Sequence, residues 1–283
     1  MAKIEVYSAK ASAKLAKDIA GSASPFTIDV RFLGGLTTKQ KDAFKRAADR
    51  WSRVIVGDLP SVMVDGEIID DILILAQGQA IDGPGKILGQ AGPSRLRPAS
   101  AGAAAFLPAK GKMAFDTADL KQMEKNGTLN DVITHEMGHV LGIGTIWDLK
   151  GLLKGAGTSN PTFTGKGASG EFGKLKGTAG PTPVPVENTG GAGTRDSHWR
   201  ESVFRNELMT GFVGASGNPL SRMTVASLQD LGYAVNLNAA EPYTLPNLMA
   251  LAEAGALTAA EAAEDRGIVL PNIPIVLPDD SLQ

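Results

Sequence analysis

The most constraining stretch of the chain is THEMGHVLGIGTIW, residues 134–147, where two histidines and a glutamate occur at a fixed spacing. His135 and His139 are four residues apart, so on a helix they lie about one turn along and roughly 40° around from each other. Both imidazoles then point the same way and can share one metal ion. Glu136 lies beside them, able to reach a metal-bound water without being a ligand. The stretch therefore predicts a helix that carries a zinc site.

The residues around this H-E-x-x-H motif favour such a helix. A turn signal stands at 126–127, and Thr128 with Asp131 predicts a capping box. Apolar residues at helical spacing continue toward Gly142, where the helix is expected to end. With so few histidines in the chain, a chance match to the whole motif is on the order of one in several hundred. A zinc site is therefore favoured over isolated structural histidines.

The third ligand is not where many zinc proteases place it, because position 145 is Thr145 and not histidine. The chain has only three histidines, and the third is His198. All three on one metal would give a His₃ site with an open position, as hydrolytic zinc enzymes use. The alternatives are that His198 is a surface imidazole, or that a downstream glutamate, Glu201 or Glu207, is the ligand.

The segments HEMGHVLGIGTIW and SHWRESVFRNELMTG, separated by a long insertion, resemble the leishmanolysin family of metzincin endopeptidases. In that family an insertion separates the motif glycine from the third histidine, which implies His198 as the ligand. The resemblance also implies that Met209 forms the methionine turn beneath the zinc-binding histidines. Eukaryotic members are rich in disulfides and are held latent by a propeptide cysteine. This chain has no cysteine, so it resembles a compact bacterial-type member without that switch.

The expected fold is α+β, because a strand, a long helix and several further strands succeed one another before the motif helix. The resemblance implies a metzincin-like zinc protease, with a twisted mixed sheet and the active-site helix in an N-terminal lobe and a smaller, more irregular C-terminal lobe. We expect an extension at 1–25, loosely held, and lobes at 26–144 and 145–283. The Gly-rich insertion, 148–197, is expected to lie over the surface or stay partly mobile. It either walls or gates the cleft, or it is a tolerated loop without such a role. Strands are predicted at 26–32, 70–79, 85–93 and 111–116, helices at 38–56 and 245–267, and an extended tail at 268–280.

The expected activity is zinc-dependent endopeptidase hydrolysis by a zinc-activated water, with Glu136 as general base and one catalytic Zn²⁺. An extended protein or peptide substrate would pair with an exposed strand edge. The resemblance assigns that edge to Ile87, Leu88, Gly89, Gln90 and Ala91. The alternative to an enzyme is a non-catalytic zinc-stabilised binding or surface protein, which would have no need of Glu136.

Composition limits the partners. The net charge of −2 and the pI near 6.0 give no basic surface for nucleic acid, and no apolar run reaches the roughly 20 residues that span a bilayer. A monomer is expected. The first 25 residues contain no continuous apolar stretch, so we expect no secretory signal there, although the family resemblance favours secretion over a cytoplasmic location.

Overall fold

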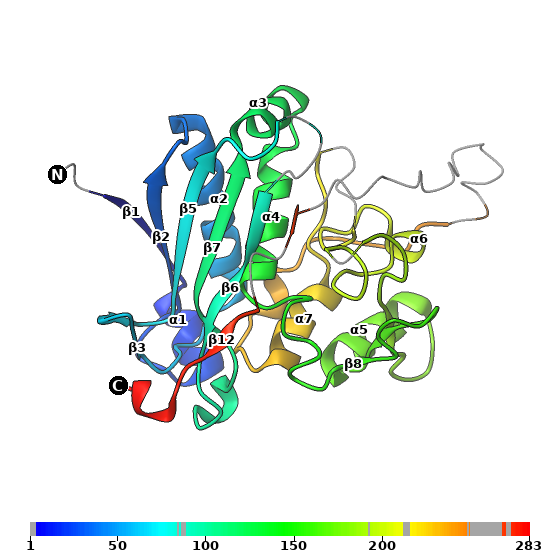
Figure 1. Cartoon of the computed structure of the whole chain (residues 1–283). Helices are drawn as coiled ribbons and strands as arrows, with labels where there is room; N and C mark the ends of the chain where they lie inside the picture. The colour runs from blue at the N-terminus through cyan, green and yellow to red at the C-terminus, as the bar shows by residue number, and fades with distance from the viewer. Residues whose placement is uncertain are drawn as a thin grey trace.

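The computed structural model describes residues 4–83, 85, 89–191, 193–211, 216–247, 249, 268–269 and 273–283, with the backbone alone at 268–269. Within these residues a mixed seven-stranded sheet has the order β1-β2-β5-β7-β6-β11, and β12 also pairs with β6 (Figure 1). Strands β2, β5 and β7 are parallel, and β1 and β6 run antiparallel to their neighbours β2 and β7. The bounds are β1 Glu5–Lys10, β2 Thr27–Gly34, β5 Ile72–Gln79, β6 Gly89–Leu96, β7 Pro108–Asp116, β11 Ile268–Val269 and β12 Ile275–Val276.

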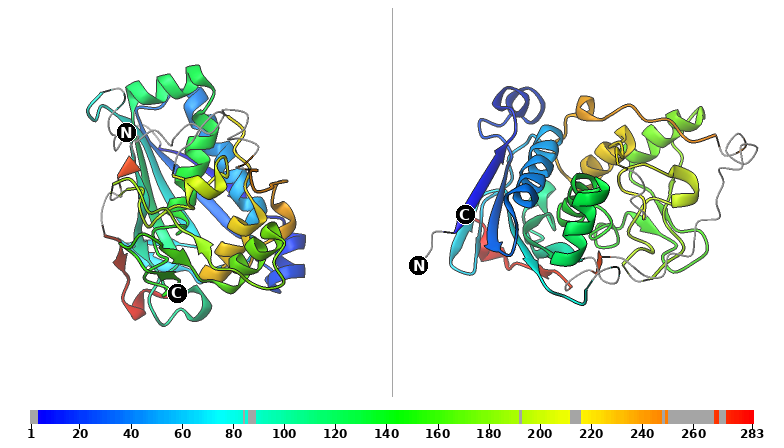
Figure 2. Two further views of the ribbon diagram at one scale, coloured as in Figure 1. Left: turned by 90° about the vertical axis from the view of Figure 1, so that its right-hand side faces the viewer. Right: turned by 90° about the horizontal axis from the view of Figure 1, so that it is seen from above.

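Two helices, α2 (Thr38–Val54) and α4 (Leu129–Val140), pack side by side on one face of the sheet (Figures 1 and 2). Helix α2 begins with a complete capping box between Thr37 and Gln40. Its buried Trp51 donates an indole hydrogen bond of 2.9 Å to the Thr134 carbonyl of α4. The motif helix is thus held rigidly between the sheet and the rest of the chain.

The elements from β8 to α7 lie on the side of α4 away from the sheet (Figure 2). They share one continuous hydrophobic core with the sheet region, so the proposed division at residues 144 and 145 stays a prediction. These elements are β8 Leu153–Lys154, β9 Thr162–Phe163, α5 Lys166–Lys176, β10 Val184–Pro185, α6 Glu201–Phe204 and α7 Arg222–Leu231.

The remaining elements are short. They are α1 Ala13–Leu15, α3 Thr117–Asn126, the hairpin of β3 Val62–Val64 and β4 Glu67–Ile69, and helical turns at Ala16–Ala20, Gly102–Ala104, Leu237–Ala239 and Asp279–Ser281. Among the described residues, no helix combines the length and the apolar composition that a bilayer crossing requires.

The strands predicted at 26–32, 70–79 and 111–116 and the helix at 38–56 are confirmed, with small shifts of their ends. The strand predicted at 85–93 is confirmed from Gly89 onward, and its residues 86–88 lie outside the described ones. The prediction of a helix at 245–267 falls almost entirely on residues outside the described ones. The extended tail is confirmed at β11 and β12, which both run parallel to β6.

Three expectations are wrong. Residues 5–10 are not loosely held, because β1 pairs with β2 over its full length. The capping box at the start of α4 is absent, since the Thr128 side chain makes no cap hydrogen bond and Asp131 instead accepts one from the Gly217 amide at 2.6 Å. The insertion is folded and not merely a surface loop: α5 packs on α7, and the insertion buries Phe163, Phe172, Val184 and Val186 in the main core.

Candidate metal centre

The three histidines of the chain meet at one point. His135 and His139 come from α4, and His198 comes from the end of the insertion. The Nε2 atoms are 3.0 Å apart for His135 and His139, 3.1 Å for His135 and His198, and 2.9 Å for His139 and His198. All three side chains are buried. Among the described residues, no other group of three histidine or acidic side chains that could hold a metal ion includes a residue of α4.

Each imidazole is oriented by a backbone carbonyl on its other nitrogen. Nδ1 of His135 faces the Leu208 oxygen at 2.7 Å, and Nδ1 of His139 faces the Ile143 oxygen at 2.8 Å. Nδ1 of His198 faces the Thr194 oxygen at 2.9 Å. A carbonyl can only accept, so each Nδ1 carries the proton and each Nε2 keeps a free lone pair. Three lone pairs directed at one another repel unless a cation lies between them.

Burial also favours the neutral ligand form of the rings. Loss of hydration lowers the pKa of His135 to about 4 and that of His198 to about 3. Burial lowers the pKa of His139 well below its usual value too, and the two neighbouring rings add to that effect. Neutral imidazole is the form that binds zinc.

Glu136 lies beside the three rings without joining them. Its Oε1 is 3.8 Å from Nε2 of His135, and its buried Oε2 has no hydrogen-bond partner among the described residues. Burial raises the pKa of this carboxyl well above its ordinary value. A buried carboxylate oxygen without a donor is costly. A cation between the three histidines would bind the converging lone pairs, and a water molecule on that cation could donate a hydrogen bond to the Glu136 oxygen. The residues therefore fit a metal.

Met209 lies directly beneath the motif helix. It is fully buried, and its sulfur and methyl group pack so closely on Gly138 that a Cβ there would meet them at 2.8 and 3.0 Å. The turn that carries it is closed by the Thr210 amide, which donates to the Glu207 carbonyl at 3.2 Å. The same turn supplies the Leu208 carbonyl that orients His135. Gly138 between the two histidines therefore allows the turn to approach α4.

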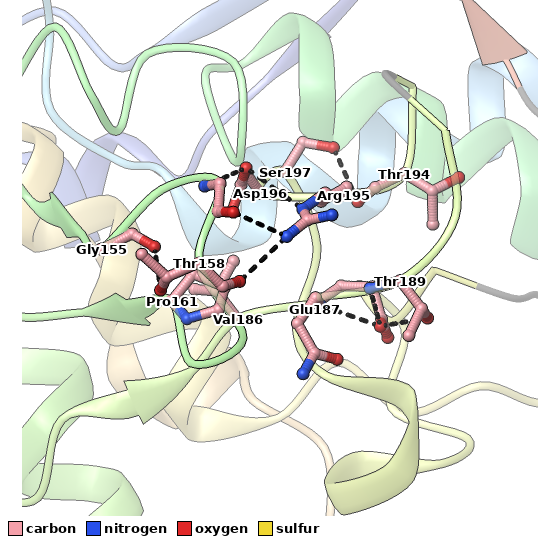
Figure 3. A network of polar contacts seen from close by, with 12 residues as sticks. Gly155, Thr158, Pro161, Val186, Glu187, Thr189, Thr194, Arg195, Asp196 and Ser197 are labelled. Atoms are coloured by element: carbon pink, nitrogen blue, oxygen red, sulfur yellow. Dashed lines mark hydrogen bonds and ion pairs between the residues drawn. The ribbon is translucent and has the colours of Figure 1, made fainter.

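His198 reaches the site because the end of the insertion folds back against the motif segment. Gly144 adopts φ +76°, and a Cβ there would lie 1.9 Å from the Ser197 carbonyl, so only glycine admits this approach. Glu187 and His198 are joined by a backbone hydrogen bond of 2.9 Å, and the Glu187 carboxylate accepts from the Thr189 and Glu201 amides. Figure 3 shows part of this region, with Thr189 beside the Glu187 carboxylate and Arg195 donating to the Thr158 carbonyl. Arg195 also donates to the Gly157 carbonyl.

The two glutamates considered as alternative ligands lie outside the histidine group. Glu207 is fully buried and its oxygens accept hydrogen bonds from amides and hydroxyls. Glu201 begins the short helix α6, and burial raises its pKa to about 7. No sequence pattern predicts the three orienting carbonyls, since any residue type supplies a carbonyl.

The predicted substrate edge is only partly described. Gly89, Gln90 and Ala91 lie in β6, whereas Ile87 and Leu88 lie outside the described residues. At Gly89 and Gln90 this edge is not free, because β11 pairs with β6 there, and the assignment of the edge to the substrate stays a prediction. Farther along, β12 pairs with Arg95 and Leu96. The chain's own C-terminal segment takes the place where a peptide was expected.

Comparison with known proteins agrees with this geometry. The sequence model of the leishmanolysin peptidase family matches residues 104–251, which include α4, all three histidines and Met209. That match covers more than half of the chain. A search of curated proteins gives no match. The chain therefore belongs to the leishmanolysin family of zinc-dependent metallopeptidases, hydrolases that act on peptide substrates.

Proposed function

We propose that the protein is a zinc endopeptidase in which His135, His139 and His198 hold one zinc ion and Glu136 is the general base. The observation that carries the proposal is the convergence of three buried Nε2 atoms within 3.1 Å of one another. They lie beside a buried carboxylate oxygen that lacks a partner among the described residues. Three neutral imidazoles with an open fourth position are the ligand set of many hydrolytic zinc enzymes.

The chemistry divides between the metal and the chain. When bound, zinc supplies a Lewis acid that lowers the pKa of a water molecule toward about 7 and polarises a peptide carbonyl. Glu136 accepts the proton of the attacking water on its free carboxylate oxygen and then delivers it to the nitrogen of the leaving amine. Since the chain's base is a carboxylate acting on water, no covalent intermediate is required.

The direct test is digestion of casein by the zinc-loaded protein with and without 1,10-phenanthroline. We expect cleavage into fragments that the chelator abolishes and that added zinc restores. A protein that holds one zinc per chain yet shows no chelator-sensitive cleavage would instead be a zinc-stabilised binding protein. Glu136 argues against that alternative, since a purely structural zinc site needs no base.

Met209→Leu is expected to fold, to bind one zinc and to keep substantial activity. The thioether packs against Gly138 and is not needed as a ligand, and leucine nearly conserves the volume of methionine. Zinc content and turnover of the purified variant measure this. Loss of zinc from a folded Met209→Leu protein would mean that the sulfur itself serves the metal.

Substrate binding involves the β6 edge in this proposal. An extended peptide would add to β6 through backbone hydrogen bonds at Gly89, Gln90 and Ala91, where it competes with β11. β11 pairs with β6 over only two residues, so few hydrogen bonds keep it there, and a longer peptide can displace it.

Val269→Pro is therefore expected to raise the rate of casein cleavage several-fold, with zinc content unchanged. Proline cannot donate to a strand pair and fixes φ near −65°, so it weakens the pairing of β11 with β6. The matched control is Ile273→Pro, at a residue that is 91% exposed and outside β11 and β12. Equal rates for Val269→Pro and the wild type would contradict the proposal that the substrate and β11 compete for the edge of β6.

A further inference from the structure

Glu207 is a fully buried carboxylate that the proposed reaction does not use. One oxygen accepts the Met209 amide at 2.7 Å. The other accepts the Ser221 amide at 3.0 Å, the Ser221 hydroxyl at 2.6 Å and the Thr224 hydroxyl at 2.5 Å. None of these donors is charged, and no ion pair with Glu207 occurs within the described part of the chain. Hydrogen bonds of this kind offset the cost of burying a charge.

These bonds tie the methionine-bearing turn to the first turn of α7. Ser221 is the N-cap of that ten-residue helix, and its side chain accepts from the Thr224 amide. A carboxylate at this end of a helix also has a favourable interaction with the helix dipole. Glu207 thus fixes the position of residues 207–210 relative to a rigid element, and it does so from inside the core.

Two zinc-binding histidines are reached from this anchored turn. The Leu208 carbonyl, next in the chain after Glu207, accepts from Nδ1 of His135 at 2.7 Å. The Met209 carbonyl accepts the amide of Trp199, the residue after His198, at 2.9 Å. The Thr224 hydroxyl that donates to Glu207 also accepts the Trp199 indole at 2.7 Å. Glu207 is therefore linked to both histidines. It is linked to His135 through the neighbouring Leu208 carbonyl, and to the residue after His198 through the Thr224 hydroxyl.

We propose that Glu207 is a positioning residue of the metal centre, whose carboxylate sets the orientation of His135 and the placement of His198. The inference rests on the proposed function to the extent that these histidines hold the zinc. It differs from a ligand role, since Glu207 lies outside the histidine group. It also differs from a purely structural role, because loss of the carboxylate should change the ligand geometry and not only the stability.

The test is Glu207→Gln, which keeps size and shape but replaces one acceptor oxygen with a donor. At least one backbone amide, that of Met209 or that of Ser221, then loses its acceptor. We expect the variant to bind one metal per chain, with zinc affinity about 10-fold weaker or more in competition with a chelator. The visible absorption of the cobalt-substituted protein should shift, and kcat should fall more than KM rises.

The matched control is Asp116→Asn, a buried carboxylate at the end of β7 that accepts the Ile81 and Ala118 amides. It should lower the melting temperature and leave the cobalt spectrum and the zinc affinity as in the wild type. Should Glu207→Gln not fold, Thr224→Val carries the same test, because it removes the hydroxyl between Glu207 and Trp199. It should change the spectrum in the same direction by a smaller amount.

Several results would overturn the inference. An unchanged cobalt spectrum and zinc affinity in Glu207→Gln, with only a lower melting temperature, would make Glu207 structural. Loss of metal stoichiometry equal to that of His198→Ala would make it a ligand. Failure of the proposed function itself is seen separately, as a wild-type protein that binds neither zinc nor cobalt at the histidines.

Discussion

Glu136→Gln is expected to leave zinc bound and to lower kcat for peptide hydrolysis by about 10²–10⁴-fold. Glutamine has the size of glutamate and fills the same buried space, but it cannot take a proton from water. The carboxylate lies 3.8 Å from the nearest ring nitrogen, that of His135, and is not assigned to the metal. Zinc content by elemental analysis and turnover of a fluorogenic peptide, measured on one preparation, separate the two roles.

The outcome that contradicts the assignment is near-normal turnover of Glu136→Gln at full zinc occupancy. Zinc loss in the same variant would instead point to a ligand role for Glu136. Met209→Leu serves as the control preparation, since it changes a buried side chain beside the same helix and should keep both zinc and turnover.

His198→Ala is expected to weaken zinc binding severely and to abolish hydrolysis. The substitution leaves two histidines from a single helix turn, and it removes the proposed ligand that comes from the end of the insertion. Two imidazoles cannot complete the three-ligand site that hydrolytic zinc requires. Titration with zinc in the presence of a competing chelator gives the change in affinity, and the casein assay gives the change in rate.

Replacement of the two rival glutamates separates the ligand classes. Glu201→Gln and Glu207→Gln should both retain metal, the second with altered affinity for the reason argued above. If a downstream glutamate were the ligand, the order of the losses in zinc binding would be reversed, and His198→Ala would have the smallest effect. Tight zinc binding by His198→Ala would therefore remove His198 from the site.

The parts of the site that lie on one helix were predictable from their spacing, and of the parts made by tertiary contact only His198 was predicted. The spacing of His135 and His139 fixes their common direction as soon as the segment is helical. His198 could be named because no other histidine is left in the chain. The role proposed for Glu207 could not be predicted from the sequence, since a glutamate near a metal motif first suggests a ligand. Only the hydrogen-bond donors around it in the structure indicate otherwise.

The fold shows the same division. Segments with a clear period, such as α2 and β2, were predicted from their pattern. Strand β1 was not predicted because the Ala-, Lys- and Ser-rich sequence around it suggested a loose segment. Its pairing with β2 depends on the tertiary structure, which the local sequence does not show. The prediction for the insertion was wrong because it rested on the high glycine content of the segment. A few apolar residues such as Phe163 and Phe172 are enough to pack the insertion into a core that other segments mainly form.

The convergence of three ring lone pairs has a thermodynamic consequence. The site exists only when segments 59 residues apart in sequence are folded together, so zinc held by the three histidines, as proposed, would bind the native state in preference to the unfolded chain. At a free zinc concentration roughly 1,000 times Kd, such binding adds about 4 kcal/mol to the free energy of unfolding. A copy that loses its zinc is then both inactive and easier to unfold, and unfolded chains are the substrates of an endopeptidase. Partial demetallation should therefore make copies that still hold zinc degrade those that have lost it, with a rate that rises with protein concentration.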